Sequence, residues 1–220
     1  MKYEIIGSSS KGNCIVVEDI LMLDCGVAYT KIKPFLKKVK LIFISHIHKD
    51  HLLPTTIKKI AYNKPTMKFV CGSKEVTQKL VECGINTKNI YLLNEGIRYD
   101  LGLLKVRLIY LFHDTPNFGL KWEIKGKKGI YLVDTEKIEH IVAQDYDLYL
   151  IEANYKEDIL ERHKKECTQE ELVYLNRVPR THLSWEQANT FLIENMGKNS
   201  EFQYIHESTY NFEGEEWWMK

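Results

Sequence analysis

The sequence predicts an α+β fold in which two β-sheets pack together and helices cover their outer faces. Short apolar runs fill the first part of the chain and are separated by glycine and charged residues, which is typical of strands. Helical stretches and a second group of strand-like runs follow. The last third is mainly helical and ends in one more strand-like run. Strands, helices, strands and helices in this order favour two sheets with helices packed outside.

The elements are expected where apolar residues recur with the period of a strand or a helix. Strands are expected at Tyr3–Ile6, Cys14–Val17, Leu21–Leu23, Leu41–Ile44, Met67–Cys71, Leu103–Leu111, Gly119–Ile124, Gly129–Val133, Leu148–Glu152 and Phe202–Ile205. Helices are expected at Leu52–Tyr62, Lys74–Cys83, Lys156–Glu166, Gln169–Asn176 and Trp185–Asn195. Thr168 and Ser184 stand just before two of these helices and are followed by acidic residues or Gln, as helix-capping residues are.

The composition is that of an ordinary globular domain. The chain has 220 residues, of which 44% are hydrophobic and 28% are charged, and this excludes disordered, collagen-like and coiled-coil proteins. No repeat, low-complexity tract or linker interrupts it, so residues 1–220 are expected to form a single domain. The formal net charge of +1 argues neither for nor against a nucleic-acid partner.

The sequence disfavours membrane and secreted proteins. The chain has no run of 18 apolar residues, and Met1–Glu4 does not resemble a signal peptide. Its five cysteines are scattered and form no Cys-x-x-Cys pair, which fits a reducing compartment better than a disulfide framework. We therefore expect a cytoplasmic protein with no membrane partner.

Lysines are concentrated in one stretch of the chain. Twelve of them lie between Lys31 and Lys79, against only Asp50 and Glu75. The simpler interpretation is that they are solvated side chains on exposed helix faces. The alternative is a rim that attracts a phosphate-bearing substrate, and the motif inside this stretch favours it.

A candidate metal-binding motif follows the expected strand at Leu41–Ile44. His46, His48, Asp50 and His51 supply four candidate ligands within six residues. His46 and His48 point to the same side of an extended chain, and after a turn Asp50 and His51 can address a second point. Imidazole nitrogens and carboxylate oxygens are the donors that Zn²⁺ and similar divalent ions accept.

Three more candidate ligands lie downstream. His113 follows an apolar run, Asp134 ends another, and His182 precedes the last expected helix. Each stands at the end of an expected strand or helix, where a side chain can reach a common cleft. Taken alone, each is better explained by a turn, a cap or a packed histidine. Together they supply the ligands that a two-metal site still needs.

These motifs, in this order, resemble the metallo-β-lactamase superfamily. The chain carries Gly7-Ser-Ser-Ser-Lys-Gly-Asn-Cys14, Leu23-Asp-Cys-Gly26 and the His-x-His-x-Asp-His motif, followed by segments around His113, Asp134, Glu152 and His182. The resemblance spans Gly7 to His206. It is closest to the YycJ-type branch of nucleases and phosphodiesterases, with tRNase Z one step further away. It implies an αββα sandwich with the metals at one edge.

The resemblance also implies a role for each ligand. His46, His48 and His113 would hold one divalent ion, Asp50, His51 and His182 would hold a second, and Asp134 would bridge both. Zn²⁺ is the first expectation for these cofactors and Mn²⁺ the second. Asp24 would fix the loop that carries the histidines.

The motifs leave two candidates for the catalytic proton donor. Where tRNase Z has a histidine in its Glu/Ala motif, this chain has Glu152-Ala-Asn-Tyr155, and YycJ-type relatives carry a histidine at the position of Tyr155. The segment Tyr204–Glu207 is similar to a closing Leu-Thr-His stretch of relatives. His206 and Tyr155 are therefore the candidates, beside Asp50 and Asp134 as catalytic metal ligands.

The expected activity is hydrolysis of phosphodiester bonds, in a nucleic acid or a nucleotide, by a hydroxide that bridges two metal ions. Three alternatives stay open. The first is a small-molecule phosphodiesterase, acting for instance on cyclic nucleotides. The second is a hydrolase of a carbon ester, thioester or lactam, and the third is a binding module that kept the metals. A deep narrow pocket would favour a small substrate, and an open basic groove would favour a nuclease.

The C-terminal pair Trp217-Trp218 follows an acidic stretch. We expect it to pack against the body of the chain. The alternative is a contact between the subunits of a homodimer, because aromatic residues are enriched at interfaces.

Overall fold

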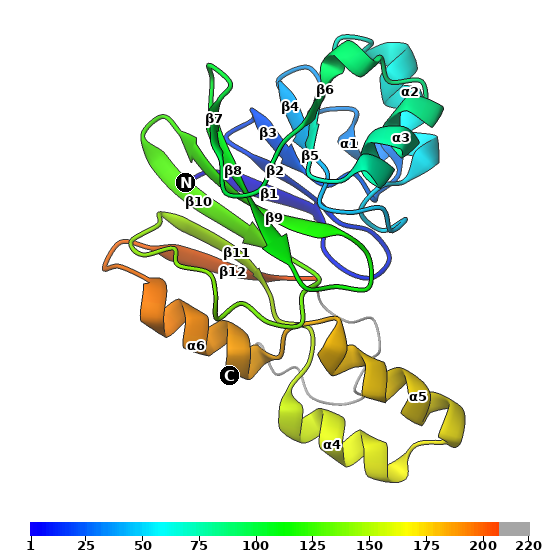
Figure 1. Cartoon of the computed structure of the whole chain (residues 1–220), viewed down its shortest axis with the longest axis vertical. Coiled ribbons are helices and arrows are strands. Elements are labelled where there is room, and N and C mark those ends of the chain that lie inside the picture. The colour runs from blue at the N-terminus through cyan, green and yellow to red at the C-terminus, as the bar shows by residue number, and fades with distance from the viewer. Residues whose placement is uncertain (207–220) are drawn as a thin grey trace.

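Two six-stranded sheets form the centre of the protein (Figure 1). The computed structural model describes residues 1–206. The strands are β1 (Tyr3–Gly7), β2 (Cys14–Val17), β3 (Leu21–Leu23), β4 (Leu41–Phe43), β5 (Lys68–Cys71), β6 (Ile90–Leu92), β7 (Arg98–Asp100), β8 (Lys105–Leu111), β9 (Asn117–Ile124), β10 (Lys127–Leu132), β11 (Leu148–Glu152) and β12 (Glu201–Ile205). The α-helices are α1 (Tyr29–Ile32), α2 (Pro54–Asn63), α3 (Lys74–Glu82), α4 (Glu157–Glu166), α5 (Gln169–Arg177) and α6 (Trp185–Asn195).

Each sheet combines antiparallel and parallel pairing. The first sheet has the order β1-β2-β3-β4-β5-β6, in which β1 to β3 are antiparallel and β3 to β6 are parallel. The second has the order β12-β11-β10-β9-β8-β7, in which β7 to β10 are antiparallel and β10 to β12 are parallel. As a result β8, β10, β11 and β12 run in one direction and end at the same edge of their sheet.

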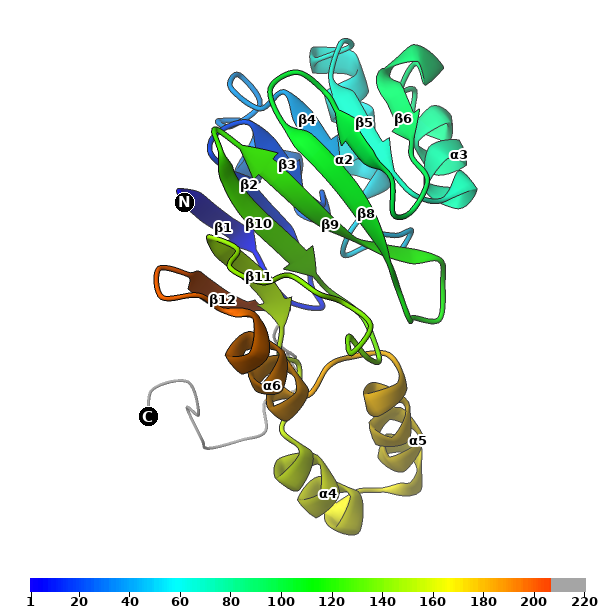
Figure 2. The ribbon, with the colours of Figure 1, turned by 60° about the vertical axis from the view of Figure 1, so that its left-hand side comes forward.

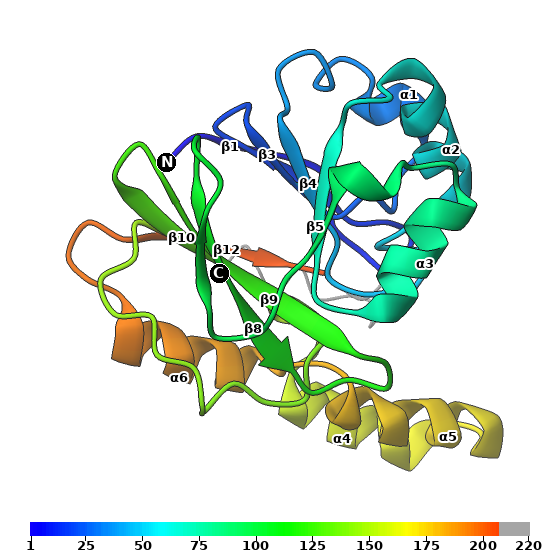
Figure 3. The same ribbon diagram turned by 45° about the horizontal axis from the view of Figure 1, so that its top comes forward.

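The layers follow the order helices, sheet, sheet, helices. Apolar side chains of both sheets, among them Phe43 and Leu120, meet in a core between them. A second core joins the first sheet to α1, α2 and α3, and a third joins the second sheet to α6. Figure 3 shows α2 and α3 outside the first sheet and α6 along the second. The pair α4 and α5 projects from this body and has a small apolar cluster of its own (Figure 2).

The predicted α+β architecture of two sheets with outer helices is confirmed. Helix α2 begins at Pro54, two residues later than expected, because proline suits the first helical position, where its missing N–H is not needed. Thr168 and Ser184 cap α5 and α6, and each forms a capping box with the residue three positions later. The short elements α1, β6 and β7 are not predicted by the sequence.

No helix within residues 1–206 is long and apolar enough to cross a membrane. The five cysteines are free. The Trp217-Trp218 pair lies outside the described residues, so its packing and the homodimer stay predictions.

Candidate metal centre

The predicted ligands gather where several strands end. The segment that carries His46 and His51 follows β4, while His113 follows β8, Asp134 follows β10 and His206 follows β12. Because β8, β10 and β12 run in the same direction, their carboxyl ends lie at one edge of the second sheet. Loops held by such a rigid scaffold are where catalytic and binding residues commonly lie.

The first donor group consists of His46, His48, His113 and Asp134, whose donor atoms all lie within 4.8 Å of one another. His46 Nε2 is 3.4 Å from Asp134 Oδ2, and His113 Nε2 is 3.4 Å from His48 Nδ1. The other ring nitrogen of His113, Nδ1, donates to the carbonyl oxygen of Thr181 at 3.1 Å. This bond orients the ring and leaves Nε2 as an acceptor that faces the group.

The second donor group consists of Asp50, His51, Asp134 and His206, again with donor atoms within 4.8 Å. His51 Nε2 lies 2.9 Å from Asp134 Oδ2 and 3.2 Å from Asp50 Oδ2. His206 Nε2 lies 3.4 Å from Asp50 Oδ2. Asp134 therefore belongs to both groups, as a residue that bridges two ions must.

A buried carboxylate, Glu152, joins a third group with Asp134, His182 and His206. Glu152 Oε1 is 2.7 Å from His182 Nδ1 and 3.0 Å from His206 Nδ1. Burial lowers the pKa of His182, but the nearby carboxylates Glu152 and Asp134 outweigh burial and raise it to about 11. Glu152 appears in the sequence only as part of a motif, and no feature of its spacing indicates that it holds two histidines.

Asp24 fixes the loop that carries the His-x-His-x-Asp-His motif. It is fully buried, and its Oδ1 accepts the Ser45 backbone N–H at 2.8 Å. Its Oδ2 accepts the Tyr131 hydroxyl at 2.7 Å and lies 2.6 Å from His51 Nδ1. Since His51 Nδ1 donates to Asp24, His51 Nε2 is turned toward Asp50 and Asp134. A carboxylate behind a ligating histidine is a common way to orient it.

The donor set fits divalent cations. His46 Nε2 is buried and has no hydrogen-bond partner among residues 1–206, although Asp134 Oδ2 is 3.4 Å away. Burial and the neighbouring His51 lower the pKa of His46, which keeps its imidazole neutral. The Ser45 hydroxyl donates to Asp24 Oδ2 and accepts the Nδ1–H of His46 at 3.1 Å, so Nε2 of His46 is an acceptor that faces a carboxylate oxygen, which is also an acceptor. Two buried acceptors that face each other are unfavourable unless a cation lies between them. His and Asp donors are those that Zn²⁺ and Mn²⁺ accept.

Two cavities meet at this edge. One, of about 210 Å³, is lined by His48, His113, Asp134, His182 and His206 of the donor groups, and by Arg177 of α5. The other, of about 550 Å³, is lined by Lys11, Lys31 and Lys49. Ser10 and Asp50 line both cavities, so the two are neighbours.

All seven candidate ligands that the sequence indicates lie at this edge, and His206 joins them. The grouping differs from the expected one, because His206 lies with Asp50 and His51 where His182 was expected. Tyr155 packs with Leu160, Leu175 and Val178 beside α4 and α5 and does not line the cavity of the donor groups. Burial and the carboxylate of Glu157 raise the pKa of Tyr155, which makes its phenol a weaker acid.

Comparison with curated proteins gives a partial match. No family model matches the chain. The chain is similar to the cytidine monophosphate-N-acetylneuraminic acid hydroxylase of Sus scrofa, with 33% identity over 103 residues. This match covers 45% of the present chain and 24% of the hydroxylase, so the chain spans about a quarter of the length of that relative.

Solved structures cover nearly the whole chain. The short form of human tRNase Z has a TM-score of 0.66 and 17% identity, and the match covers 94% of this chain and 93% of that one. YhfI, a metallo-β-lactamase fold protein of Bacillus subtilis, has a TM-score of 0.70 and 14% identity, with 94% and 87% covered. At these identities the likeness establishes the fold. The chain has the metallo-β-lactamase fold, as its motifs imply.

Proposed function

We propose that this chain is a metal-dependent hydrolase that cleaves phosphodiester bonds and holds two divalent ions. The observation that carries the proposal is the pair of donor groups that share Asp134. Two ions held in this way would supply a water activated near neutral pH and would neutralise charge on the phosphoryl oxygens. The fold neighbour that bears the name tRNase Z supports the same class of substrate.

The ligand assignment that we propose uses seven side chains. His46, His48 and His113 serve one ion, Asp50, His51 and His206 serve the other, and Asp134 serves both. His206 replaces the expected His182, because its donor atom groups with those of Asp50 and His51. Zn²⁺ and Mn²⁺ both suit this His and Asp set, and their availability in the cell would decide between them.

We assign the proton donor to His182. Its Nδ1 is held by Glu152 at 2.7 Å, and its side chain is about one fifth exposed in the wall of the cavity. The buried carboxylate orients the ring and stabilises its protonated form, which is the arrangement of a general acid with its orienting partner. During cleavage the proton would pass from His182 to the leaving oxygen of the substrate. Cations bound beside the ring would lower its pKa, because nearby positive charge disfavours the imidazolium.

The neighbouring lysine cavity favours an extended anionic substrate. Lys11, Lys31 and Lys49 line it, and none of the three forms a salt bridge within residues 1–206. A polynucleotide that is cleaved beside Asp134 would place its next phosphates toward these lysines, where positive charge attracts them. This arrangement favours a nuclease over the alternative of a cyclic-nucleotide phosphodiesterase, whose substrate has no such extension.

Turnover of bis-p-nitrophenyl phosphate by the metal-loaded protein, with and without a chelator, tests the reaction class. A panel of single-stranded DNA, RNA, cyclic nucleotides, carbon esters, thioesters and lactams tests the substrate class. We expect chelator-sensitive cleavage of phosphodiesters, with oligonucleotides preferred over cyclic nucleotides. Faster cleavage of carbon esters, or no metal-dependent cleavage of any phosphodiester, would overturn the proposal.

A further inference from the structure

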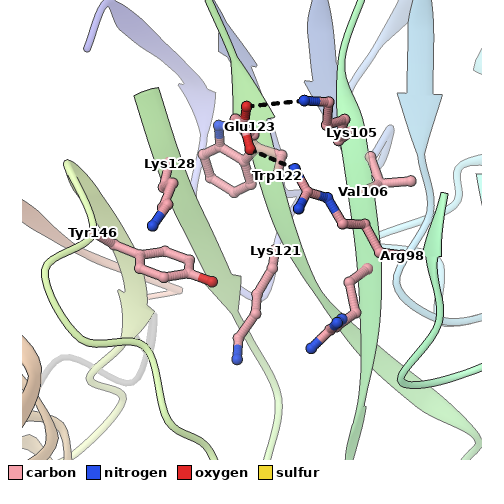
Figure 4. Close-up of a pocket in the computed structure, with 9 residues that line it drawn as sticks. Arg98, Lys105, Val106, Lys121, Trp122, Glu123, Lys128 and Tyr146 are labelled. Carbon is pink, nitrogen blue, oxygen red and sulfur yellow. Dashed lines mark hydrogen bonds and ion pairs between the residues drawn. The ribbon is translucent and has the colours of Figure 1, made fainter. Parts of the chain in front are cut away.

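The outer face of the second sheet carries a basic cavity away from the metal centre. Helix α6 covers part of this face, where Ile109 and Ile130 pack against it. Further along the same strands, a cavity of about 240 Å³ is left open (Figure 4). Its polar wall consists of Arg98, Lys105, Arg107, Lys121, Lys128 and Tyr146, together with Glu123.

Three cations of this wall stand side by side across three strands. Arg98 of β7 pairs in register with Arg107 of β8, and Arg107 pairs with Lys121 of β9. Like charges at directly opposite positions of a sheet repel each other. Such a row is therefore unfavourable unless negative charge compensates it.

The carboxylate in the wall is already engaged. Glu123 accepts hydrogen bonds from Arg98 at 2.8 Å and from Lys105 at 3.3 Å, and Figure 4 shows its side chain turned toward both. Arg107, Lys121 and Lys128 form no salt bridge with any carboxylate of residues 1–206. The cavity thus holds positive charge that the described part of the chain does not neutralise.

Lys121 is the most confined of these cations. Its ammonium donates to the Val142 carbonyl oxygen at 2.5 Å. Burial and the neighbouring Arg107 lower the pKa of Lys121. Both effects disfavour the charged form, and a bound anion would counteract them, because opposite charge nearby favours the ammonium.

An aromatic ring lies beside the unneutralised lysines. The ammonium groups of Lys121 and Lys128 are 5.9 and 5.8 Å from the centre of the Tyr146 ring. Figure 4 shows this ring at the side of the hollow, next to both lysines. A ring on which a base can stack, next to cations that can bind phosphate, is the usual pattern of nucleotide and single-strand recognition.

We propose that this cavity binds one nucleotide unit, with its phosphate against Arg107 and Lys121 and its base against Tyr146. The cavity of about 240 Å³ is smaller than pockets that enclose a small ligand, which measure about 300–1,000 Å³, so the nucleotide unit would be partly enclosed and partly exposed. The unit is either a free nucleotide or part of a polynucleotide strand. The two sources share this chemistry, and the experiment below separates them.

The cavity is distinct from the metal centre. Asn117 at the start of β9 donates to the backbone carbonyl of Asp134 at 2.6 Å, so this end of β9 lies at the edge of the sheet that carries the metal centre. Lys121 lies four residues further along β9, which at a rise of about 3.3 Å per residue is ~13 Å. Binding here does not depend on the hydrolysis proposed above, and either proposal can fail without the other.

Calorimetric titration of the metal-loaded full chain with deoxyadenosine 5′-monophosphate tests the site. The double variant Arg107→Gln/Lys121→Gln should weaken this binding by about tenfold or more, since it removes two charge-assisted contacts. The control Lys37→Gln/Lys125→Gln changes the net charge equally, at two exposed lysines that do not line the cavity, and should bind as the wild type does. Both variants should hydrolyse bis-p-nitrophenyl phosphate at the wild-type rate, which also reports that they are folded.

Two further experiments test whether the base stacks on Tyr146 and whether the nucleotide is free or part of a strand. Tyr146→Leu should weaken binding of the deoxynucleotide several-fold and leave ribose 5-phosphate unaffected, because only the base would stack. The affinity that Arg107→Gln/Lys121→Gln loses should be larger for a hydrolysis-resistant phosphorothioate octamer of the same base than for the mononucleotide if the source is a strand, and smaller if it is a free nucleotide. This difference excludes octamer held at the metal centre, because the variant leaves that site unchanged. The proposal would be overturned if Arg107→Gln/Lys121→Gln bound the mononucleotide and the octamer as tightly as the wild type does. It would also be overturned if the wild type bound neither of them.

Discussion

Asp24 is the residue that links the core between the sheets to the metal centre. Its carboxylate is buried and holds the Ser45 backbone, the Tyr131 hydroxyl and His51 Nδ1 at once. Replacing one oxygen by an amide removes an acceptor and the negative charge behind His51. The ring would then lose its fixed tautomer and orientation.

We therefore expect Asp24→Asn to weaken metal binding by about 10–100-fold. Competition titration with a chromophoric chelator measures the affinity. Asp19→Asn is the matched control, since Asp19 pairs with Lys2 and Lys38 near the surface, far from the donor groups. Unchanged affinity in Asp24→Asn would contradict the role given to this residue.

His182 and His206 have separable roles in the proposed assignment. His182→Gln should keep two ions and lower kcat by about 10²–10⁴, the usual contribution of a general acid. His206→Gln should instead lose metal from the group of Asp50 and His51. Metal content and single-turnover kinetics of the two variants check this. Loss of an ion in His182→Gln, with two ions kept in His206→Gln, would restore the assignment that the motifs imply.

At the scale of elements, the loop after β4 depends on a close approach to Gly26. A Cβ atom at Gly26 would lie 1.6 Å from the Asp50 carbonyl oxygen and 2.8 Å from the His51 backbone nitrogen. The same segment is held by the Asn13 backbone N–H, which donates to the Asp50 carbonyl at 2.6 Å. Asp50 and His51 therefore keep their place only if position 26 has no side chain.

Gly26→Ala should displace this loop, cost about 1–3 kcal/mol of stability and weaken metal binding. Thermal unfolding and metal content measure the two effects. Gly96→Ala is the control: its φ of +74° makes alanine strained, but no atom lies within 4 Å of the added Cβ. It should lose some stability and keep its metal. Equal metal binding by both variants would count against the packing argument.

The sequence predicts the apolar strands better than those with exposed or charged residues. The runs that became β4, β8 and β11 are apolar enough to be recognised, and proline and capping residues mark where α2, α5 and α6 begin. The three-residue strands β6 and β7 carry partly exposed or charged residues such as Arg98 and Asp100. β6 is a strand because it pairs with β5, from which helix α3 separates it in the sequence, and β7 is a strand because it forms a hairpin with β8. Neither three-residue run shows a strand pattern by itself.

The sequence likewise predicts one part of the site better than the rest. The His-x-His-x-Asp-His motif places four candidate ligands in one loop, so a short stretch of sequence reveals them. The choice between His182 and His206 depends on where β12 ends relative to β11, and this is a property of the folded sheet. The contacts of Glu152 have the same origin, since it closes β11 beside Ile205 of β12.

At the scale of the whole molecule, bound metal should stabilise the fold, because the donor groups join loops of both sheets. A ligand present at a hundred times its Kd contributes about 2.7 kcal/mol, which in a domain of this size corresponds to roughly 5–10 °C in Tm. We expect a chelator to lower Tm by this order near pH 7.5. The difference should shrink below about pH 6, because protons then compete for the histidines. Scanning calorimetry at both pH values checks this, and a Tm insensitive to chelator at pH 7.5 would contradict it.

The number of metal ions bound per chain tests the central claim most directly. After metal loading and dialysis, inductively coupled plasma mass spectrometry should find two divalent ions in the wild type and in the surface control Asp158→Ala. Asp134→Ala should hold fewer, because both donor groups lose their shared ligand. A wild type without bound ions, or an Asp134→Ala variant that still binds two, would contradict the account.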